Sequence, residues 1–199
     1  VAVLLSVLGM EKGWATDVST ETELKNAIDN GDSYVRLTAD IELSSTLTIS
    51  SGERTLDLNG KKLSYQQGET SYGSSIDAIT ISVSGGNLIL KNGTISAIAG
   101  KHRAGLGWYT GNDAKTLVYN GGALRISNII LTATKGEGST SVSDGKNYTY
   151  FSEKKIGEVL AQGTYLTDGG SYDRTNIETT TTTISLVLYN VEYNVDGGT

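Results

Sequence analysis

A short pattern of apolar residues around an Asn recurs along this chain, and it constrains the fold more than any other feature. The pattern occurs as LDLNGKKLS at 56–64, LILKNGTIS at 88–96 and LRISNIILT at 124–132, with LVLYNVEYN at 186–194 as a fourth copy. The first three copies begin 32 and 36 residues apart, and each follows an apolar segment and a Gly-containing turn. Self-similarity at such a period predicts stacked repeats.

Repeats made of short strands without intervening helices predict a β-solenoid, because one strand–turn–strand unit cannot bury its apolar face alone. Identical side chains on successive coils of such a fold lie about 4.8 Å apart. An amide has donor and acceptor groups, so a column of Asn side chains can hydrogen-bond along the stack. Asn also tolerates the left-handed dihedral angles of a tight corner. The predicted internal ladder consists of Asn92, Asn128 and Asn190, with Asn59 joining after a slip of one residue.

One short helix is predicted ahead of the repeats, in STETELKNAIDNG at 19–31. Thr20 and Glu23 fit a capping box, in which each side chain satisfies a free backbone amide of the other residue. Gly31 can supply the left-handed residue that ends the helix. Its apolar face consists of Leu24, Ala27 and Ile28. From Tyr34 onward the apolar period changes to two, which indicates strands.

The first residues suggest export. VAVLLSVLG at 1–9 is apolar and has the length of a signal-peptide core, but it is too short to span a bilayer as a helix. Ala15 can end a processing site. We therefore interpret 1–15 as a signal-peptide remnant or N-terminal segment, and 16–199 as a β-helix domain that is the N-terminal part of a longer protein. The expected location is secreted or cell-surface, without a membrane span in the mature chain, as a monomer or part of a larger chain.

A family resemblance adds to this interpretation. ELKNAIDNG, VRLTADIELSSTLTI and RTLDLNGKKLS together resemble the start of secreted bacterial right-handed parallel β-helix proteins of the pectin-lyase-like superfamily. The resemblance covers roughly Thr20 to Thr132, and the rest of the chain only loosely. It implies an all-β fold, namely a right-handed parallel β-helix with a short N-terminal capping helix and an Asn ladder at one corner. The superfamily includes polysaccharide lyases, glycosidases, adhesins and surface domains, so the fold alone selects no function.

Length variation between the repeats falls at one junction, in segments 65–75, 97–114 and 135–178. If the repeats stack in register, these insertions emerge on the same side, which is often the binding face of a solenoid. Their aromatic residues are interleaved with Gly, Ser, Asn and Asp, which suits sugar rings and protein contacts equally. Alternatively, the aromatic rings pack back as small cores under the insertions. The candidate ligand contacts are Tyr72, His102, Trp108, Tyr109, Tyr148 and Tyr150.

Few residues typical of catalysis or metal binding are present. The chain has no Cys, and its only histidine, His102, cannot build a His-rich metal site. The β-helix lyases hold calcium with several acidic side chains on one sheet. The matching outward column here is predicted to contain Asp57, Ile89, Arg125 and Val187, with a single acid. We expect no metal and no cofactor. A formal charge of −6 argues against a nucleic-acid partner.

Three functional hypotheses follow. The leading one is a non-catalytic, adhesin-like binding module whose clustered insertions contact a glycan or a host protein. The alternative is a polysaccharide-degrading enzyme, a lyase or glycosidase, with its site in the same insertions, so enzymatic activity stays open. The third is ice binding by a flat Thr array, if Thr48, Thr80 and Thr116 align as an outward column beside the run ETTTTTIS at 178–185.

Overall fold

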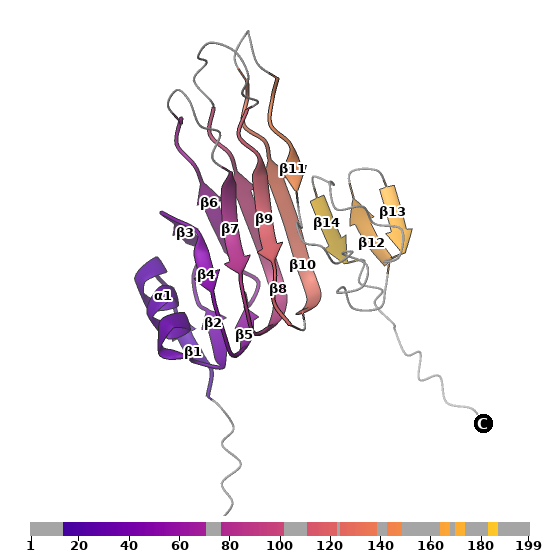
Figure 1. Ribbon diagram of the computed structural model, residues 1–199. Coiled ribbons are helices and arrows are strands. Elements are labelled where there is room, and N and C mark those ends of the chain that lie inside the picture. Colours follow the sequence, from indigo (N-terminus) through magenta and orange to yellow (C-terminus); the bar gives the residue numbers. More distant parts are fainter. Residues whose placement is uncertain are drawn as a thin grey trace, which may run out of the picture.

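The fold is all-β over the part of the chain that can be described. The computed structural model describes residues 14–70, 77–101, 111–122, 124–138, 143–148, 164–167, 170–173 and 183–186. Within these ranges the chain forms strands and one helix, α1 (Glu21–Asn30), which lies near the N-terminal end of the stacked strands (Figure 1).

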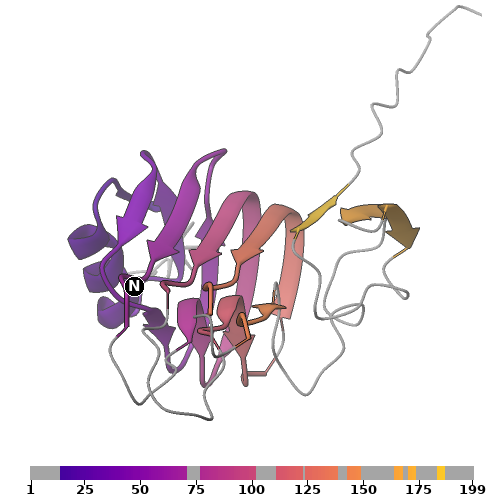
Figure 2. The ribbon, with the colours of Figure 1, turned by 90° about the horizontal axis from the view of Figure 1, so that it is seen from above.

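Helix α1 begins and ends as the sequence predicts. Thr20 Oγ1 accepts a hydrogen bond from Glu23 N at 3.2 Å, and the Glu23 carboxylate accepts one from Thr20 N at 3.2 Å. Gly31 follows the helix in the left-handed conformation, with φ 89°. The buried face consists of Leu24, Ala27 and Ile28. Seen from above, the helix covers the end of the core next to the first strands (Figure 2).

The strands form two sheets. The larger sheet contains β1 (Thr16–Val18), β2 (Tyr34–Leu37), β3 (Ile41–Leu43), β5 (Glu53–Asp57), β6 (Lys62–Gln66), β8 (Asn87–Ile98), β10 (Leu124–Thr134), β12 (Thr164–Thr167), β13 (Gly170–Asp173) and β14 (Thr183–Leu186). The smaller sheet contains β4 (Leu47–Ile49), β7 (Ala78–Val83), β9 (Ala114–Tyr119) and β11 (Asn147–Tyr148).

The chain alternates between the two sheets in successive repeats. Each repeat runs along a strand of the smaller sheet, through a short turn into the larger sheet, and then through an insertion back to the smaller sheet. In the described part of the chain, the strand pairs among β1 to β11 are parallel. Strand β10 follows β8 along almost its whole length, from Leu124 opposite Leu88 to Thr134 opposite Ile98. Successive repeats therefore lie directly against one another.

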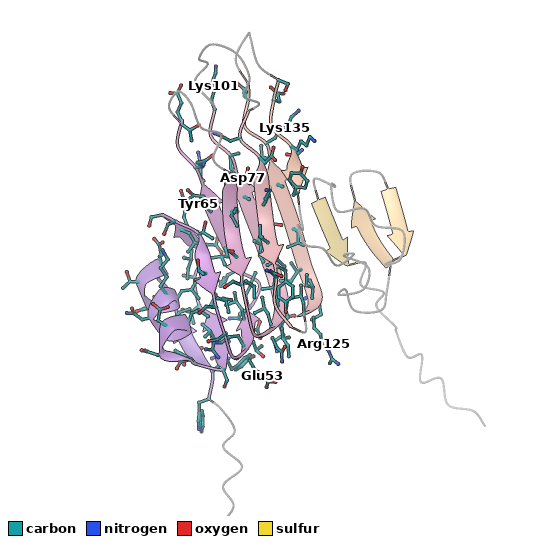
Figure 3. All side chains as sticks on the ribbon, in the orientation of Figure 1. Glu53, Tyr65, Asp77, Lys101, Arg125 and Lys135 are labelled. Atoms are coloured by element: carbon teal, nitrogen blue, oxygen red, sulfur yellow. The ribbon has the colours of Figure 1, made fainter. Side chains whose placement is uncertain are left out.

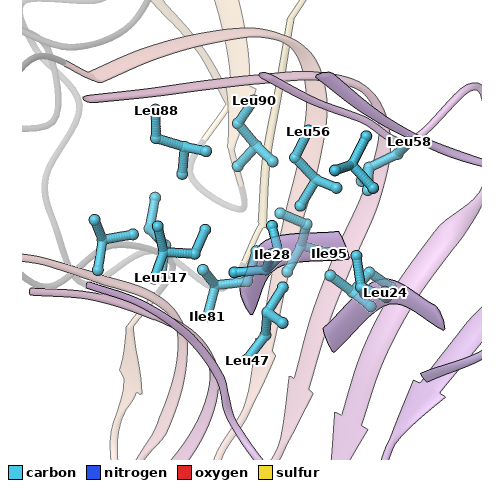
Figure 4. Packing of buried hydrophobic residues seen from close by; sticks show 14 of the residues in the cluster. Leu24, Ile28, Leu47, Leu56, Leu58, Ile81, Leu88, Leu90, Ile95 and Leu117 are labelled. Atoms are coloured by element: carbon cyan, nitrogen blue, oxygen red, sulfur yellow. The ribbon is translucent and has the colours of Figure 1, made fainter. Parts of the chain in front are cut away.

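The core lies between the two sheets. Parallel pairing aligns inward side chains in columns, such as Leu56 opposite Leu90 and Leu90 opposite Ile126, all of them buried. Figure 4 shows Leu56, Leu88 and Leu90 on one side of the core, with Leu47, Ile81 and Leu117 on the other. Toward the insertions, small side chains let the sheets approach each other. This second cluster consists of Ala78, Ala97, Ala99, Ala114 and Ala133, with Tyr65 packed against it.

Strand β14 does not continue the parallel stacking. Of the predicted fourth copy at 186–194 it contains only Leu186, and the rest of that copy lies outside the described residues. Strand β14 runs antiparallel to β10, with Leu131 opposite Ile184, and β12 is antiparallel to both β13 and β14. A parallel strand needs a crossover connection through the other sheet. The segment before Leu186 lacks the Gly-containing turn that precedes the other three copies.

The predicted outward Thr column is also wrong. Thr80 and Thr116 are fully buried, and Thr80 Oγ1 donates a hydrogen bond to Ser96 O at 2.8 Å. Thr48 is exposed, but it lies opposite Ser82. The hydroxyl of Thr80 is satisfied inside the fold, which allows the residue to face inward. These three residues therefore supply no flat Thr array for ice.

The predicted column of Asp57, Ile89 and Arg125 is only partly correct. Ile89 lies opposite Arg125, but Asp57 lies opposite Lys91. The reason is the corner of the first repeat. Four residues, 58–61, separate the paired positions of β5 and β6, whereas two residues, 92–93, occupy that place in β8. Val187 lies outside the described residues.

The alternation along β8 predicts very different costs for neighbouring substitutions. Leu90 is fully buried, so Leu90→Ala should lower the free energy of unfolding by about 2–5 kcal/mol through lost burial and a cavity. Ile89 is 41% exposed, and Ile89→Ala should cost less than about 1 kcal/mol. Urea denaturation of both variants measures the difference, and equal costs would contradict the inward and outward assignment.

Candidate functional site

The repeated Asn residues occupy corners of the larger sheet. Asn59, Asn92 and Asn128 have φ angles of 50°, 61° and 50°, in the left-handed region that Asn tolerates better than most residues. Asn128 Nδ2 donates a hydrogen bond to Asn92 Oδ1 at 3.2 Å. The amides of two successive repeats are therefore joined at this corner.

Below Asn92 the ladder differs from the expectation. Asn92 Nδ2 donates to Asp57 Oδ1 at 3.1 Å, whereas Asn59 Nδ2 donates to the backbone oxygen of Leu37 at 3.1 Å. The two extra residues in the first corner displace Asn59, and Asp57 takes the position beneath Asn92. The fourth ladder candidate, Asn190, lies outside the described residues.

Asp57 is the most highly connected carboxylate of the corner. Its oxygens accept hydrogen bonds from Tyr34 Oη at 2.8 Å and Asn59 N at 2.9 Å, and Lys91 Nζ lies 3.5 Å away. Burial is the largest single influence and raises the pKa of Asp57. The hydrogen bonds from Tyr34, Asn59 and Asn92, with the charge of Lys91, outweigh it and hold the pKa below its ordinary value.

The lowered pKa makes the contribution of Asp57 to stability depend on pH. The unfolded chain takes up this proton first, near the ordinary Asp pKa of about 3.9, so stability is lost as pH falls through the lower folded pKa. Asp57→Asn should therefore destabilise most above about pH 5, and the difference from wild type should shrink in acid. Thermal unfolding from pH 7 to pH 2 measures this. Asp29→Asn, on the exposed face of α1, is the control, and a difference that stays constant with pH would contradict the assignment.

Where each repeat leaves the larger sheet, the bases of the insertions lie together. We call this surface the insertion flank, and it consists of residues 67–70, 99–101, 111–113, 135–138 and 143–146. Thr70 N donates to Lys101 O at 3.0 Å, and Gly136 N donates to Asn112 O at 2.9 Å. Figure 3 shows Lys101 and Lys135 toward this end of the molecule. The first, second and third insertions therefore start from one side of the fold.

A file of glycines sets the spacing within the flank. A Cβ on Gly100 would overlap the backbone oxygen of Gly68, and a Cβ on Gly136 would overlap that of Gly100. Gly145 is packed in the same way against Asn112 O. Since only Gly permits such a close approach of one backbone to the next, these positions bring successive insertions into direct contact.

The buried side chain of Asn112 links the first and second insertions. It is fully buried, and Nδ2 donates to Thr70 Oγ1 and to Gly100 O, both at 2.8 Å. A buried amide requires such partners, because an unsatisfied one costs about 1–3 kcal/mol. Asn112 thus holds the second insertion against the first.

The third insertion is closed at its base by a carboxylate. Gly138 N donates to Asp144 Oδ1 at 2.9 Å, and Lys135 Nζ lies 3.1 Å from Asp144 Oδ2. The amide of Gly138, followed by the hydrogen bond and charge of Lys135, lowers the pKa of Asp144 below its ordinary value. This exposed pair shapes the segment between β10 and β11.

A polar group on the smaller sheet borders the flank. Lys115 Nζ forms an ion pair with Asp77 Oδ2 and lies 5.4 Å from the ring centroid of Tyr148. Tyr148 is half-buried at the end of β11. It is the one predicted ligand contact within the described residues. The other predicted contacts, Tyr72, His102, Trp108, Tyr109 and Tyr150, lie outside them.

Neither a metal centre nor a helical membrane span is found among the described residues. Nowhere in these ranges do three or more His, Cys, Asp or Glu side chains gather closely enough to hold a metal ion. No helix in the described ranges combines the length and apolar character needed to cross a bilayer. Comparisons with protein-family models, curated proteins and solved structures found no match for this chain.

Sequence reasoning missed the glycine file, although a signal was present. Gly68, Gly100 and Gly136 are 32 and 36 residues apart, which is the same spacing as the repeated Leu-x-Leu segments. Glycines that recur at the period of the repeats indicate close contact between neighbouring backbones. Asn112 and the Lys115–Asp77 pair carry no comparable signal, because each occurs in one repeat only.

The glycine file predicts that two similar substitutions have different effects. Gly100→Ala should lower the free energy of unfolding by about 1–3 kcal/mol, because its Cβ would meet the backbone of Gly68. Gly68→Ala is the matched control, since a Cβ there has open space around it. Guanidinium unfolding of the two variants is the measurement. A Gly100→Ala variant as stable as Gly68→Ala would contradict the close packing.

Proposed function

We propose that this chain is a non-catalytic, adhesin-like binding module of a secreted or cell-surface protein, and that its insertions bind a glycan or a protein. The supporting observation is the contact between insertion bases, in which Asn112 bonds to Thr70 and Gly100. Insertions that start from one flank can contribute to one ligand surface. Their aromatic and amide side chains suit sugar rings, whose hydroxyl groups need hydrogen-bond partners.

We also propose a specific form of the fold. The two sheets form a right-handed parallel β-helix with α1 as its N-terminal cap, of the type found in the pectin-lyase-like superfamily. Support comes from the parallel, in-register pairing of β5, β8 and β10, and from the left-handed Asn residues at the corners. The antiparallel strands β12 to β14 then lie outside the regular repeats.

A glycan array with the purified protein tests the binding function. We expect retention of a defined set of glycans by the wild-type chain. Trp108→Ala combined with Tyr109→Ala should weaken retention at least about tenfold, because aromatic residues dominate the binding free energy of many ligand surfaces. Trp14→Ala is the matched control, since Trp14 is 93% exposed and lies before the repeats. It should bind as wild type does.

Two further measurements make this test decisive. Circular dichroism of the double variant must match that of wild type, so that lost binding cannot be due to unfolding. Each retained glycan is then incubated with the protein and its length is measured. Shortened chains would replace the non-catalytic proposal by the polysaccharide-degrading alternative. Unchanged retention by the double variant would remove Trp108 and Tyr109 from the site.

A further inference from the structure

A second surface lies at the other end of the sheet, away from the insertion flank. It is an open cleft of about 450 Å³ on the larger sheet, within the range of about 300–1,000 Å³ that small-molecule sites occupy. Figure 3 shows Glu53 and Arg125 at this end of the molecule, opposite Lys101 and Lys135. The lining residues that matter here are Tyr34, Glu53, Thr55, Asn87, Ile89 and Arg125, and we call the site the sheet-end cleft.

The strand register arranges the floor of the sheet-end cleft. Tyr34 lies opposite Thr55, Thr55 opposite Ile89, and Ile89 opposite Arg125. At about 4.8 Å between adjacent strands, this outward row is about 14 Å long. It begins at an aromatic residue, continues across Ile89, which is 41% exposed, and ends at a guanidinium. The row thus presents an apolar surface with a positive charge at one end.

Charge in the sheet-end cleft differs in sign from that of the whole chain. The residues that line it include two arginines, Arg54 and Arg125, and one acidic residue, Glu53, whereas the chain has a formal charge of −6. Within the described ranges, no carboxylate lies within ion-pair distance of Arg125. The nearby carboxylate of Asp57 is already bonded to Tyr34 and paired with Lys91.

Glu53 places a carboxylate in the lining of the sheet-end cleft. Its carboxylate accepts a hydrogen bond from Asn87 Nδ2 at 3.2 Å, and its backbone oxygen accepts one from Arg54 at 3.0 Å. A second anionic group on the ligand would be repelled by this carboxylate. A guanidinium, in contrast, binds one carboxylate through two parallel hydrogen bonds.

We propose that the sheet-end cleft binds a molecule with one carboxylate on an apolar body. Arg125 holds the carboxylate, and the body lies across Ile89 and Thr55 toward Tyr34. A free organic acid presents this chemistry, and so does the C-terminal residue of a peptide with an apolar side chain. The site is separate from the insertion flank, so either binding function can fail without the other.

An NMR titration with 3-phenylpropionate tests the proposal, with 3-phenylpropanamide as the uncharged probe. The acid should shift the backbone amides of Thr55 and Ile89. The amide probe should bind at least about tenfold more weakly, since only the acid can form charge-assisted hydrogen bonds with the guanidinium. Arg125→Gln should weaken binding of the acid by a similar factor. Ile89→Ser should weaken it about threefold to tenfold.

Two matched variants control for general effects of charge and surface apolarity. Arg36→Gln removes a guanidinium that is paired with Asp17, outside the cleft. Ile130→Ser removes an isoleucine that is 42% exposed, on the other half of β10. Both should bind 3-phenylpropionate as wild type does. Equal binding of the acid and amide probes, wild-type affinity in Arg125→Gln, or shifts confined to the insertion flank would each overturn the proposal.

The source of the carboxylate is distinguished by a second pair of probes, acetyl-Gly-Gly-Phe with a free C-terminus and its C-terminal amide. Tighter binding of the free-acid peptide than of 3-phenylpropionate would indicate a peptide terminus, and weaker binding a small organic acid. Both results support carboxylate binding in the sheet-end cleft, provided that Arg125→Gln lowers the affinity. A peptide and its amide that bind equally would contradict it.

Discussion

Parallel hydrogen bonding between successive repeats, in one register along the whole of β8 and β10, is the interaction on which the rest of the structure depends. It turns positions that are about 36 residues apart into neighbours about 4.8 Å apart. Inward apolar residues of successive repeats therefore form columns in the core, and outward residues form rows on the surface. The buried core, the Asn corner, the insertion flank and the sheet-end cleft all follow from this alignment.

Local patterns were sufficient to predict the parts of the fold that depend on local chemistry. The capping box of Thr20 and Glu23 and the alternation from Val35 to Ile49 need no knowledge of distant residues. The register between β5 and β8 cannot be predicted locally, because two extra residues in the first corner change which side chains are opposite each other. Leu56 therefore lies opposite Leu90, although its sequence pattern matches Leu88. The antiparallel direction of β14 cannot be predicted from its sequence for a similar reason, since a short strand of four residues with alternating apolar side chains pairs either way.

The candidate sites were predictable to different degrees. Insertions of varying length at one junction indicate a shared side, and the contacts of Gly100 and Gly136 lie at that junction. The buried amide of Asn112 was not predictable, because an Asn in a Gly-rich segment looks like an ordinary turn residue. The sheet-end cleft was hidden as well. Ile89 and Arg125 were expected to be neighbours, but the place of Thr55 and Tyr34 beside them depends on the corrected register.

The Asn corner, which lies within β8 and β10, and the insertion flank, which follows these strands, hold successive repeats together with different chemistry. At the corner, Asn128 bonds to Asn92 and Asn92 to Asp57 through side chains, so each position requires a particular residue. At the flank, backbone meets backbone at Gly100 and Gly136, and the side chain of Asn112 adds hydrogen bonds to Thr70 and Gly100. These contacts involve only the bases, so the rest of each insertion can change in length and composition while the bases stay about one strand spacing apart. A ligand wider than that spacing would touch more than one insertion, which makes the flank suited to recognition by several segments at once.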